Sequence, residues 1–199
     1  MFRQALGVAF EQMHPTLQLH YDPPADATVT LRGVMETWNR FPLLRLALPF
    51  APLNAARVEV VVRNRVRHIA GGALAYEWQR EFRYPGHVLS SHTLTRLSPL
   101  HPRDHVMDCF PPPFATAIEL SLSLAEGGAA LVQQSTSYQY ALLGRRQLRL
   151  PVPLQVRVSA LERTVGEHEI ETEVTISHVW LGRLFGYRGR LALIDVSHV

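Results

Sequence analysis

The sequence has no lysine, since all 20 of its basic residues are arginine. This excludes a lysine Schiff base and the lysine of a phosphate-binding loop. Gly-x-Gly-x-x-Gly, the glycine pattern of dinucleotide-binding folds, and Gly-x-Ser-x-Gly, that of serine hydrolases, are also missing. The sequence therefore gives no support to nucleotide binding by these routes, or to serine-hydrolase chemistry.

Cysteine and long apolar runs are equally scarce. Cys109 is the only cysteine, so no disulfide can form within the chain, and we expect a cytoplasmic protein. The N-terminus lacks the apolar segment of a signal peptide. The most apolar region, Phe41 to Leu53, is interrupted by Arg45 and by prolines, so we expect no transmembrane segment.

The composition is that of a globular protein. With 199 residues, of which 47% are hydrophobic and 19% charged, the chain suits one domain over residues 1–199. The net charge is +3, and the arginines are spread along the sequence without a recognition motif, so we expect no nucleic-acid partner. Arg63, Arg65 and Arg67 share one face of a predicted strand, which suits a solvated face better than a phosphate site.

Period-two alternation dominates the chain and predicts about nine strands. We place them at residues 28–40, 56–68, 73–84, 87–97, 115–125, 129–142, 155–165, 168–178 and 188–196. Residues 2–13 have helical spacing, and Pro42 to Leu48 suits a short apolar helix. Residues 98–113, 144–153 and 181–187 are predicted as connecting or irregular segments. Short turns favour antiparallel pairing. The predicted fold is mainly β (α+β): a curled antiparallel sheet or barrel wrapped over an N-terminal helix, a shape that often holds a ligand cavity.

One predicted strand, Tyr76 to Tyr84, carries the most specific signal. Its apolar face holds four aromatic residues with Arg80 at the centre: Tyr76, Trp78, Phe82 and Tyr84. A guanidinium keeps its charge, so Arg80 needs a partner or water. The partner is either an anionic ligand or an acid of the chain such as Glu36, Glu119 or Asp195.

Several motifs resemble a known family. They are Trp78-x-Arg80-x-Phe82, Gly144-Arg-Arg-Gln-Leu-Arg-Leu-Pro151, Leu181 to Leu191, Ala5-Leu-Gly7 and Leu31-Arg-Gly33. Together they are similar to the bacterial domain of unknown function 4166. Residues 107–114 depart from the acidic-glycine pattern expected there. The family carries no established activity, but its domain also occurs attached to oxidoreductase-like dinucleotide-binding domains, so the resemblance implies an oxidoreductase partner.

Three further groups allow two interpretations each. Tyr187 and Arg188 precede Gly189, and Arg188 and Arg190 suit either an anion site or a glycine-set bend with solvated arginines. Arg145, Arg146 and Arg149 suit an anion or membrane-headgroup patch or a solvated loop. Metal-ligand side chains cluster at His101, Asp104, His105 and Asp108, but the prolines that follow indicate a loop, and we predict no metal site and no cofactor.

These observations favour a binding domain. The predicted cavity would hold a small apolar or acidic molecule, such as a fatty acid, with Arg80 as its polar anchor and residues 41–53 as its lid or mouth. The predicted ligand-binding residues are Tyr76, Trp78, Arg80, Phe82, Tyr187 and Arg188. An enzyme using the same cavity, with Tyr76, Tyr84 or a histidine transferring protons, remains an alternative. A non-catalytic interaction module for an oxidoreductase is another.

Overall fold

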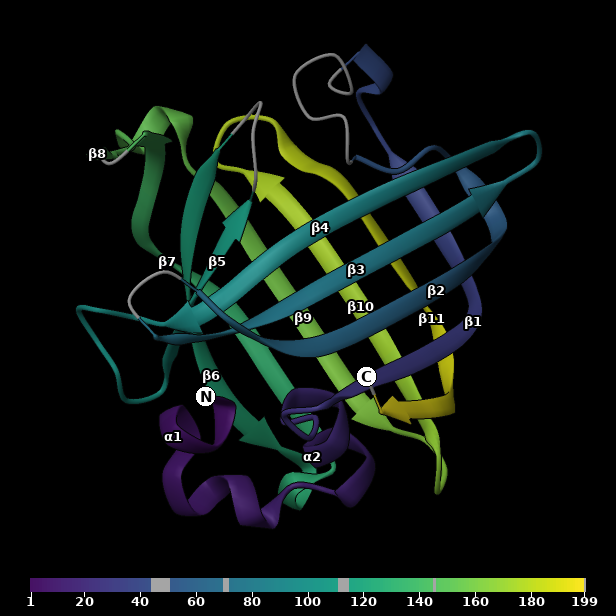
Figure 1. The fold of residues 1–199 in the computed structure, drawn as a ribbon. Helices are drawn as coiled ribbons and strands as arrows, with labels where there is room; N and C mark the ends of the chain where they lie inside the picture. Colours follow the sequence, from purple (N-terminus) through teal and green to yellow (C-terminus); the bar gives the residue numbers. More distant parts are fainter. Residues whose placement is uncertain (44–50, 70–71, 111–114, 145, 199) are drawn as a thin grey trace.

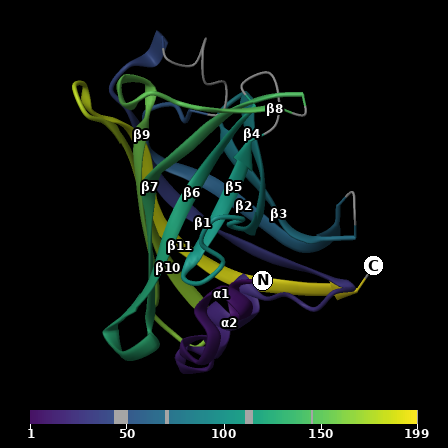
Figure 2. The same cartoon turned by 90° about the vertical axis from the view of Figure 1, so that its left-hand side faces the viewer.

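The computed structural model describes residues 1–43, 51–69, 72–110, 115–144 and 146–198. Eleven antiparallel strands form one sheet in the order β6-β5-β4-β3-β2-β1-β11-β10-β9-β7-β8. An additional β6–β7 pairing closes ten of them into a barrel, with β8 as an extra strand at one end (Figures 1 and 2). The strands are β1 Ala27–Asn39, β2 Ala55–His68, β3 Leu74–Tyr84, β4 His87–Leu97, β5 His105–Phe110, β6 Thr116–Ala125, β7 Ala130–Leu143, β8 Arg146–Arg149, β9 Val156–Thr164, β10 Glu169–His178 and β11 Gly182–His198. The predicted curled sheet or barrel is thus confirmed.

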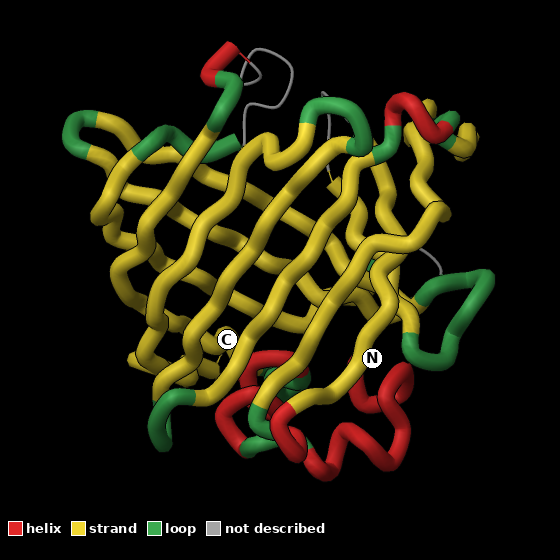
Figure 3. The backbone as a smooth tube through the Cα atoms, turned by 180° about the vertical axis from the view of Figure 1, so that it is seen from behind, coloured by secondary structure: helices red, strands yellow, loops and turns green. Residues whose placement is uncertain are grey.

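The N-terminal helices close one end of the barrel (Figures 1 and 3). They are α1 Phe2–Leu6, the 3-10 helix η1 Gly7–Gln12 and α2 Pro15–Tyr21. The large apolar side chains of this segment are buried in the barrel core: Phe2, Phe10, Leu17 and Tyr21. The predicted helix over residues 2–13 is therefore two pieces, because Gly7 at its centre has φ +56°, outside the α-helical region.

The turns at this end also contact the helices. Thr16 Oγ1 donates a hydrogen bond to the Glu167 carbonyl in the β9–β10 turn. His14 N donates to the Gly128 carbonyl in η3, the short 3-10 helix Glu126–Gly128 between β6 and β7. We call this end the helix end. The β8–β9 and β10–β11 connections and the described parts of the β1–β2 and β7–β8 connections lie at the opposite end (Figures 1 and 3), where η4 Val152–Leu154 precedes β9.

The strand prediction was wrong at three places. β5 lies in the proline-rich segment predicted as a loop, and its six residues are too short for a clear period-two signal. β8 lies in the predicted arginine-rich connector. β11 begins at Gly182 and not at the predicted residue 188. Gly186 and Gly189, which suggested an irregular segment or a bend, are strand residues in close contact with neighbouring strands. The short helix predicted at Pro42 to Leu48 lies mostly outside the described residues.

Close approach between β1 and β11 requires glycine. A Cβ atom on Gly33 would lie 1.8 Å from the Arg190 carbonyl oxygen, and one on Gly189 would lie 2.3 Å from the Val34 carbonyl oxygen. Both contacts involve backbone, which cannot rotate away. These glycines therefore let the two strands curve tightly in the barrel wall.

Ion pairs cover the outside of β2 and β3. Arg63 pairs with Glu81 at 2.6 Å, and Arg65 and Arg67 both pair with Glu77. The row of arginines is thus a charge-paired strand face. No described helix is long and apolar enough to span a membrane.

Candidate functional site

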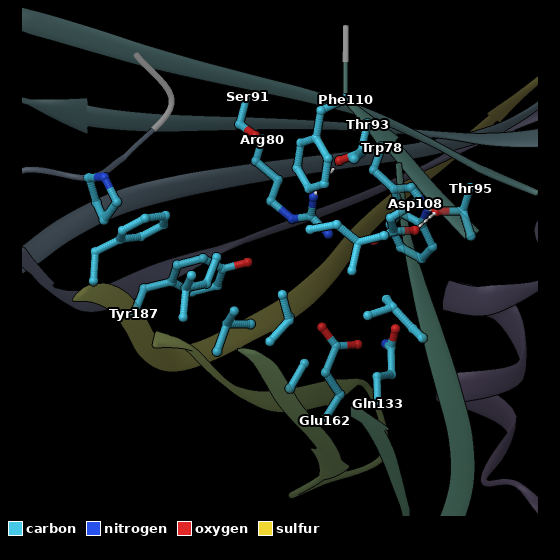
Figure 4. A pocket seen from close by; sticks show the side chains of 18 of the residues that line it. Trp78, Arg80, Ser91, Thr93, Thr95, Asp108, Phe110, Gln133, Glu162 and Tyr187 are labelled. Carbon is cyan, nitrogen blue, oxygen red and sulfur yellow. Dashed lines mark hydrogen bonds between the residues drawn. The ribbon is translucent and has the colours of Figure 1, made fainter. Parts of the chain in front are cut away.

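The barrel encloses a cavity of about 100 Å³. Phe2 and Tyr21 from the helices line it at one end, and Pro52 and Phe110 line it toward the other. Its wall is mostly apolar, with residues from β3 to β7 and β9 to β11 facing inward. Figure 4 shows a small set of polar side chains that point into this apolar space.

Arg80 is the cation of this cavity. It lies on the inward face of β3, opposite Val62 of β2 and Ser91 of β4. Its guanidinium donates one hydrogen bond, from Nη1 to Thr93 Oγ1 at 3.2 Å, and lies 5.5 Å from the centre of the Trp78 ring. Within the described chain, no carboxylate forms an ion pair with it. Most of its five N–H groups therefore have no acceptor among the described residues.

The charge on Arg80 is nevertheless balanced at longer range. Burial acts to lower the pKa of Arg80, but Tyr187, Glu162 and Asp108 raise it above its ordinary value. The guanidinium therefore remains charged. Its surroundings supply negative potential without using up its hydrogen-bond donors.

Glu162 on β9 is the best-satisfied polar group of the cavity. Its carboxylate accepts hydrogen bonds from the Tyr21 hydroxyl and, at 3.1 Å, from Thr172 Oγ1, and it pairs with His20 Nε2 at 3.1 Å. Burial acts to raise the pKa of Glu162, but the His20 ring, the Tyr21 hydrogen bond and the charge of Arg80 lower it to about 2. The carboxylate is therefore ionised at neutral pH.

The tautomer of His20 follows from its other neighbour. Asn64 Nδ2 lies 2.8 Å from His20 Nδ1 and 3.2 Å from the His20 carbonyl oxygen. The amide donates to both, so Nδ1 is the acceptor and Nε2 carries the proton toward Glu162. His20 thus presents its Nε2 hydrogen to the Glu162 carboxylate.

Asp108 on β5 is the second carboxyl group in the cavity. It accepts a hydrogen bond from Thr95 Oγ1, which in turn accepts one from Trp78 Nε1 at 2.8 Å. Burial raises the pKa of Asp108 above its usual value, and the Thr95 hydrogen bond and Arg80 offset this only in part. The two acidic groups of the cavity are thus shifted in opposite directions.

Tyr187 on β11 places its hydroxyl in the same space as the Arg80 guanidinium (Figure 4). Burial raises its pKa, so the hydroxyl stays protonated. Neither this hydroxyl nor that of Ser91 has a hydrogen-bond partner among the described residues. Together with Arg80 they give the cavity several polar groups that remain available to a ligand.

The structure brings four of the six predicted site residues to the cavity: Trp78, Arg80, Phe82 and Tyr187. Tyr76 lies at the helix end, where its hydroxyl donates to Asp22. Arg188 lies on the outside of the barrel and pairs with Glu36 at 2.8 Å. Neither residue lines the cavity.

The predicted acidic partners of Arg80 are wrong. Glu36 pairs with Arg188, and Glu119 accepts hydrogen bonds from Ser98, His101 and Thr136 instead. Asp195 is exposed near the C-terminal end of β11. Tyr84, a predicted proton donor, contacts Thr37 and Leu53, outside the cavity lining.

The sequence did not lead us to Glu162, and it indicated Asp108 only as a candidate metal ligand. Glu162 follows Val158 and Ala160 on the inward face of β9, so it shows the same signal that identified Arg80: one charge on an apolar strand face. Asp108 lies on the same face of β5 as Val106 and Phe110, but the neighbouring prolines obscured this strand. Gln133, which also lines the cavity, lies on β7 without any comparable signal.

The histidine-rich segment divides between two faces. The rings of His101 and His105 lie 5.2 Å apart near the surface, whereas Asp108 points into the cavity. Among the described residues, no group of three or more histidine, cysteine, aspartate or glutamate side chains is arranged to hold a metal ion.

Comparison with known protein families identifies a match over most of the chain. The profile described as a domain of unknown function, DUF4166, matches residues 13–191, which is most of the chain. The chain belongs to the DUF4166 family. No curated protein matches it. Among solved structures, the crystal structure of Rv2717c from M. tuberculosis aligns with this DUF4166 chain at a TM-score of 0.47 and 13% identity, over 92% of this chain and 99% of that one.

Proposed function

We propose that the barrel binds a small molecule with an apolar body and one acidic group, and that Arg80 anchors the acidic group. The observation that carries this proposal is the state of Arg80: a buried guanidinium that faces a cavity with one hydrogen bond and no ion pair among the described residues. A buried charge without a partner is costly. A ligand carboxylate would provide the bidentate acceptor that the described residues do not.

The size of the cavity limits the ligand. The volume of about 100 Å³ is somewhat smaller than the cavities of about 150 Å³ that take up benzene in engineered proteins. A short-chain acid suits this space, and a small aromatic acid would require a modest enlargement of it. A long-chain fatty acid would need the cavity to enlarge, so it is the less favoured member of the class.

The polar groups also suit an acid. Arg80 donates to one side of a carboxylate, and the free Tyr187 hydroxyl lies in the same space. Glu162 would not compete, because its own hydrogen-bond partners already hold it. Asp108, with its raised pKa, can take up a proton and become a further donor.

The first experiment is native mass spectrometry of the purified protein, followed by denaturing extraction of what it carries. We expect a small acidic compound bound to wild type and lost from Arg80→Met. Calorimetric titration with benzoate, benzamide and toluene then tests the class directly. Benzoate should bind most tightly to wild type and lose its advantage in Arg80→Met.

The matched control is Arg83→Met, three residues along the same strand. Arg83 lies on the outside of the barrel and pairs with Glu59 and Glu81. This variant should retain the ligand and the benzoate affinity. A clean apo mass together with equal affinities for benzoate and toluene would refute the proposal.

A second candidate function rests on the opposite pKa shifts of Glu162 and Asp108. Carboxyl groups whose pKa values are driven apart in one site are typical of acid–base catalysts. Here Asp108 would transfer the proton and Glu162 would stay ionised. The test is incubation of the extracted compound with the protein: chemical change that stops in Asp108→Asn, while binding persists, would establish catalysis.

A further inference from the structure

The end of the barrel opposite the helices exposes an unusual number of apolar side chains. We call its described segments, residues 39–43, 143–144, 146–157 and 178–183, the mouth rim. Trp180 is 71% exposed, and these segments expose further aliphatic side chains: Leu43, Leu143, Leu148, Val152, Leu154, Val179 and Leu181. This is a larger apolar group than isolated surface residues explain.

Hydrogen bonds join the pieces of the rim. His178 Nε2 donates to the Pro153 carbonyl at 2.9 Å, which links the β10–β11 turn to η4. Arg40 N donates to the Leu184 carbonyl at 2.8 Å, which links the end of β1 to the start of β11. The exposed apolar groups therefore lie on connected backbone at one end of a rigid barrel.

Arginines accompany these apolar groups, and they differ from those on the barrel wall. The five described arginines of the rim and its immediate border are exposed: Arg40, Arg146, Arg149, Arg157 and Arg183. On the wall, most arginines form ion pairs, as Arg63 does with Glu81 and Arg163 with Glu171, although Arg57 and Arg96 form none with a described residue. None of the five rim arginines forms an ion pair with a described residue.

Acidic residues are missing from the rim. The sequence has no aspartate or glutamate in residues 39–54, 143–157 or 178–183. The helix end, by contrast, carries Asp22, Asp26, Glu126 and Glu167. The small net charge of +3 thus hides a strong difference between the two ends.

We propose that the mouth rim docks on the surface of a lipid bilayer that contains anionic lipids. Exposed tryptophan and aliphatic side chains enter the boundary between headgroups and acyl chains, and unpaired arginines bind the lipid phosphates. A nucleic acid would also attract the arginines, but exposed leucine and valine side chains offer nothing to bases or phosphates. The observations therefore favour a membrane surface.

This inference goes beyond the proposed binding function and does not depend on it. The cavity extends toward the rim, where Pro52 and Phe110 line it. Docking at this end would face the cavity toward the membrane. Membrane binding without any cavity ligand, or the reverse, would separate the two proposals.

The test is flotation of the full chain with vesicles of phosphatidylcholine alone and of equal parts phosphatidylcholine and phosphatidylglycerol. We expect binding to the anionic vesicles only, weakened by added salt. Arg146→Glu should reduce the affinity about 25-fold, because each arginine near such a surface contributes about fivefold. Val152→Ser should reduce it about fivefold through lost apolar burial.

Matched controls lie at the helix end. Arg103→Glu reverses an exposed arginine in the segment that contacts α1, and Val8→Ser makes the same change as Val152→Ser at a side chain that is 86% exposed. Both variants should bind like wild type. Circular dichroism checks that all four variants fold.

A second readout uses Trp180 directly. Its fluorescence should shift to shorter wavelength on anionic vesicles, and Trp180→Phe should remove that shift. Equal binding to neutral vesicles, no binding at all, or equal loss in the helix-end controls would each overturn the proposal. If the protein bound an RNA homopolymer but no vesicles, and Arg146→Glu abolished the RNA binding, the result would overturn the proposal in favour of a nucleic-acid surface.

Discussion

The Tyr21 hydroxyl donates a hydrogen bond to the Glu162 carboxylate and accepts one from Gln133 Nε2 at 2.6 Å. Tyr21 ends α2, Glu162 lies on β9 and Gln133 on β7. One hydroxyl therefore ties the helices to two strands of the barrel wall. All three residues line the cavity near the helix end. The hydrogen bond from Tyr21 therefore both holds the helices on the barrel and orients the ionised Glu162 carboxylate.

Tyr21→Phe should destabilise the fold by about 1–3 kcal/mol, because Gln133 and Glu162 each lose a buried partner. Urea unfolding measures this change. Tyr138→Phe is the control, because the half-buried Tyr138 hydroxyl has no hydrogen-bond partner among the described residues, and it should change stability by less than about 0.5 kcal/mol. Equal effects of the two variants would contradict the assigned role.

Glu162 should make stability depend on acid pH. Its pKa falls from 4.5 to about 2 on folding, so its contribution is complete above the unfolded value and is lost as pH falls from about 4.5 to about 2. The shift corresponds to about 3 kcal/mol at neutral pH. Unfolding titrations of wild type and Glu162→Gln should differ by roughly this amount at neutral pH and converge in acid. A constant difference across pH would refute the assignment.

Arg80 shows how far the sequence alone could lead. Alternation placed Trp78, Arg80 and Phe82 on one inward face, and the structure has them there. The groups that surround the Arg80 guanidinium could not be chosen from sequence, because the register that brings β9 across the cavity is set by the closure of the barrel through β6 and β7. Long-range register depends on the packing of the whole sheet, which no local pattern contains.

Arg80→Met should leave the stability of the unliganded protein within about 1 kcal/mol of wild type, because no described carboxylate is left unpaired by the change. An arginine in a buried ion pair would instead cost roughly 3–5 kcal/mol. Affinity for benzoate should fall between about tenfold and a hundredfold, the range of a charged hydrogen bond. Urea unfolding and calorimetry measure the two quantities, and a large stability loss with unchanged affinity would contradict this prediction.

Asp108 illustrates the opposite case. Its strand, β5, has only six residues, and proline-rich sequence follows it, so local signals indicate a loop. Pairing with β4 and β6 imposes the strand conformation and turns Asp108 inward. Tertiary pairing overrides the weak local preference here. For this reason the sequence did not place Asp108 in the cavity.

Asp108 should link ligand binding to proton uptake. Its pKa is already raised by burial, and a bound carboxylate beside it would raise it further. Affinity for ionised benzoate should therefore increase as pH falls toward the raised pKa of Asp108, with protons taken up on binding. Asp108→Asn, which mimics the protonated form, should bind benzoate with the same affinity across this pH range. Calorimetry in buffers of different ionisation enthalpy measures the proton count, and a pH-independent wild type would rule this out.

Gly33→Ala tests the close contact between β1 and β11. The new Cβ would lie 1.8 Å from the Arg190 carbonyl oxygen, so one of two paired strands must move, at a cost of about 1–3 kcal/mol or more. Gly166→Ala in the β9–β10 turn is the matched control, because its Cβ would meet nothing closer than the Glu169 Cβ at 3.8 Å. The control should remain within about 0.5 kcal/mol of wild type. Thermal and urea unfolding compare them, and a stable Gly33→Ala protein would mean that the barrel tolerates a wider separation of β1 and β11.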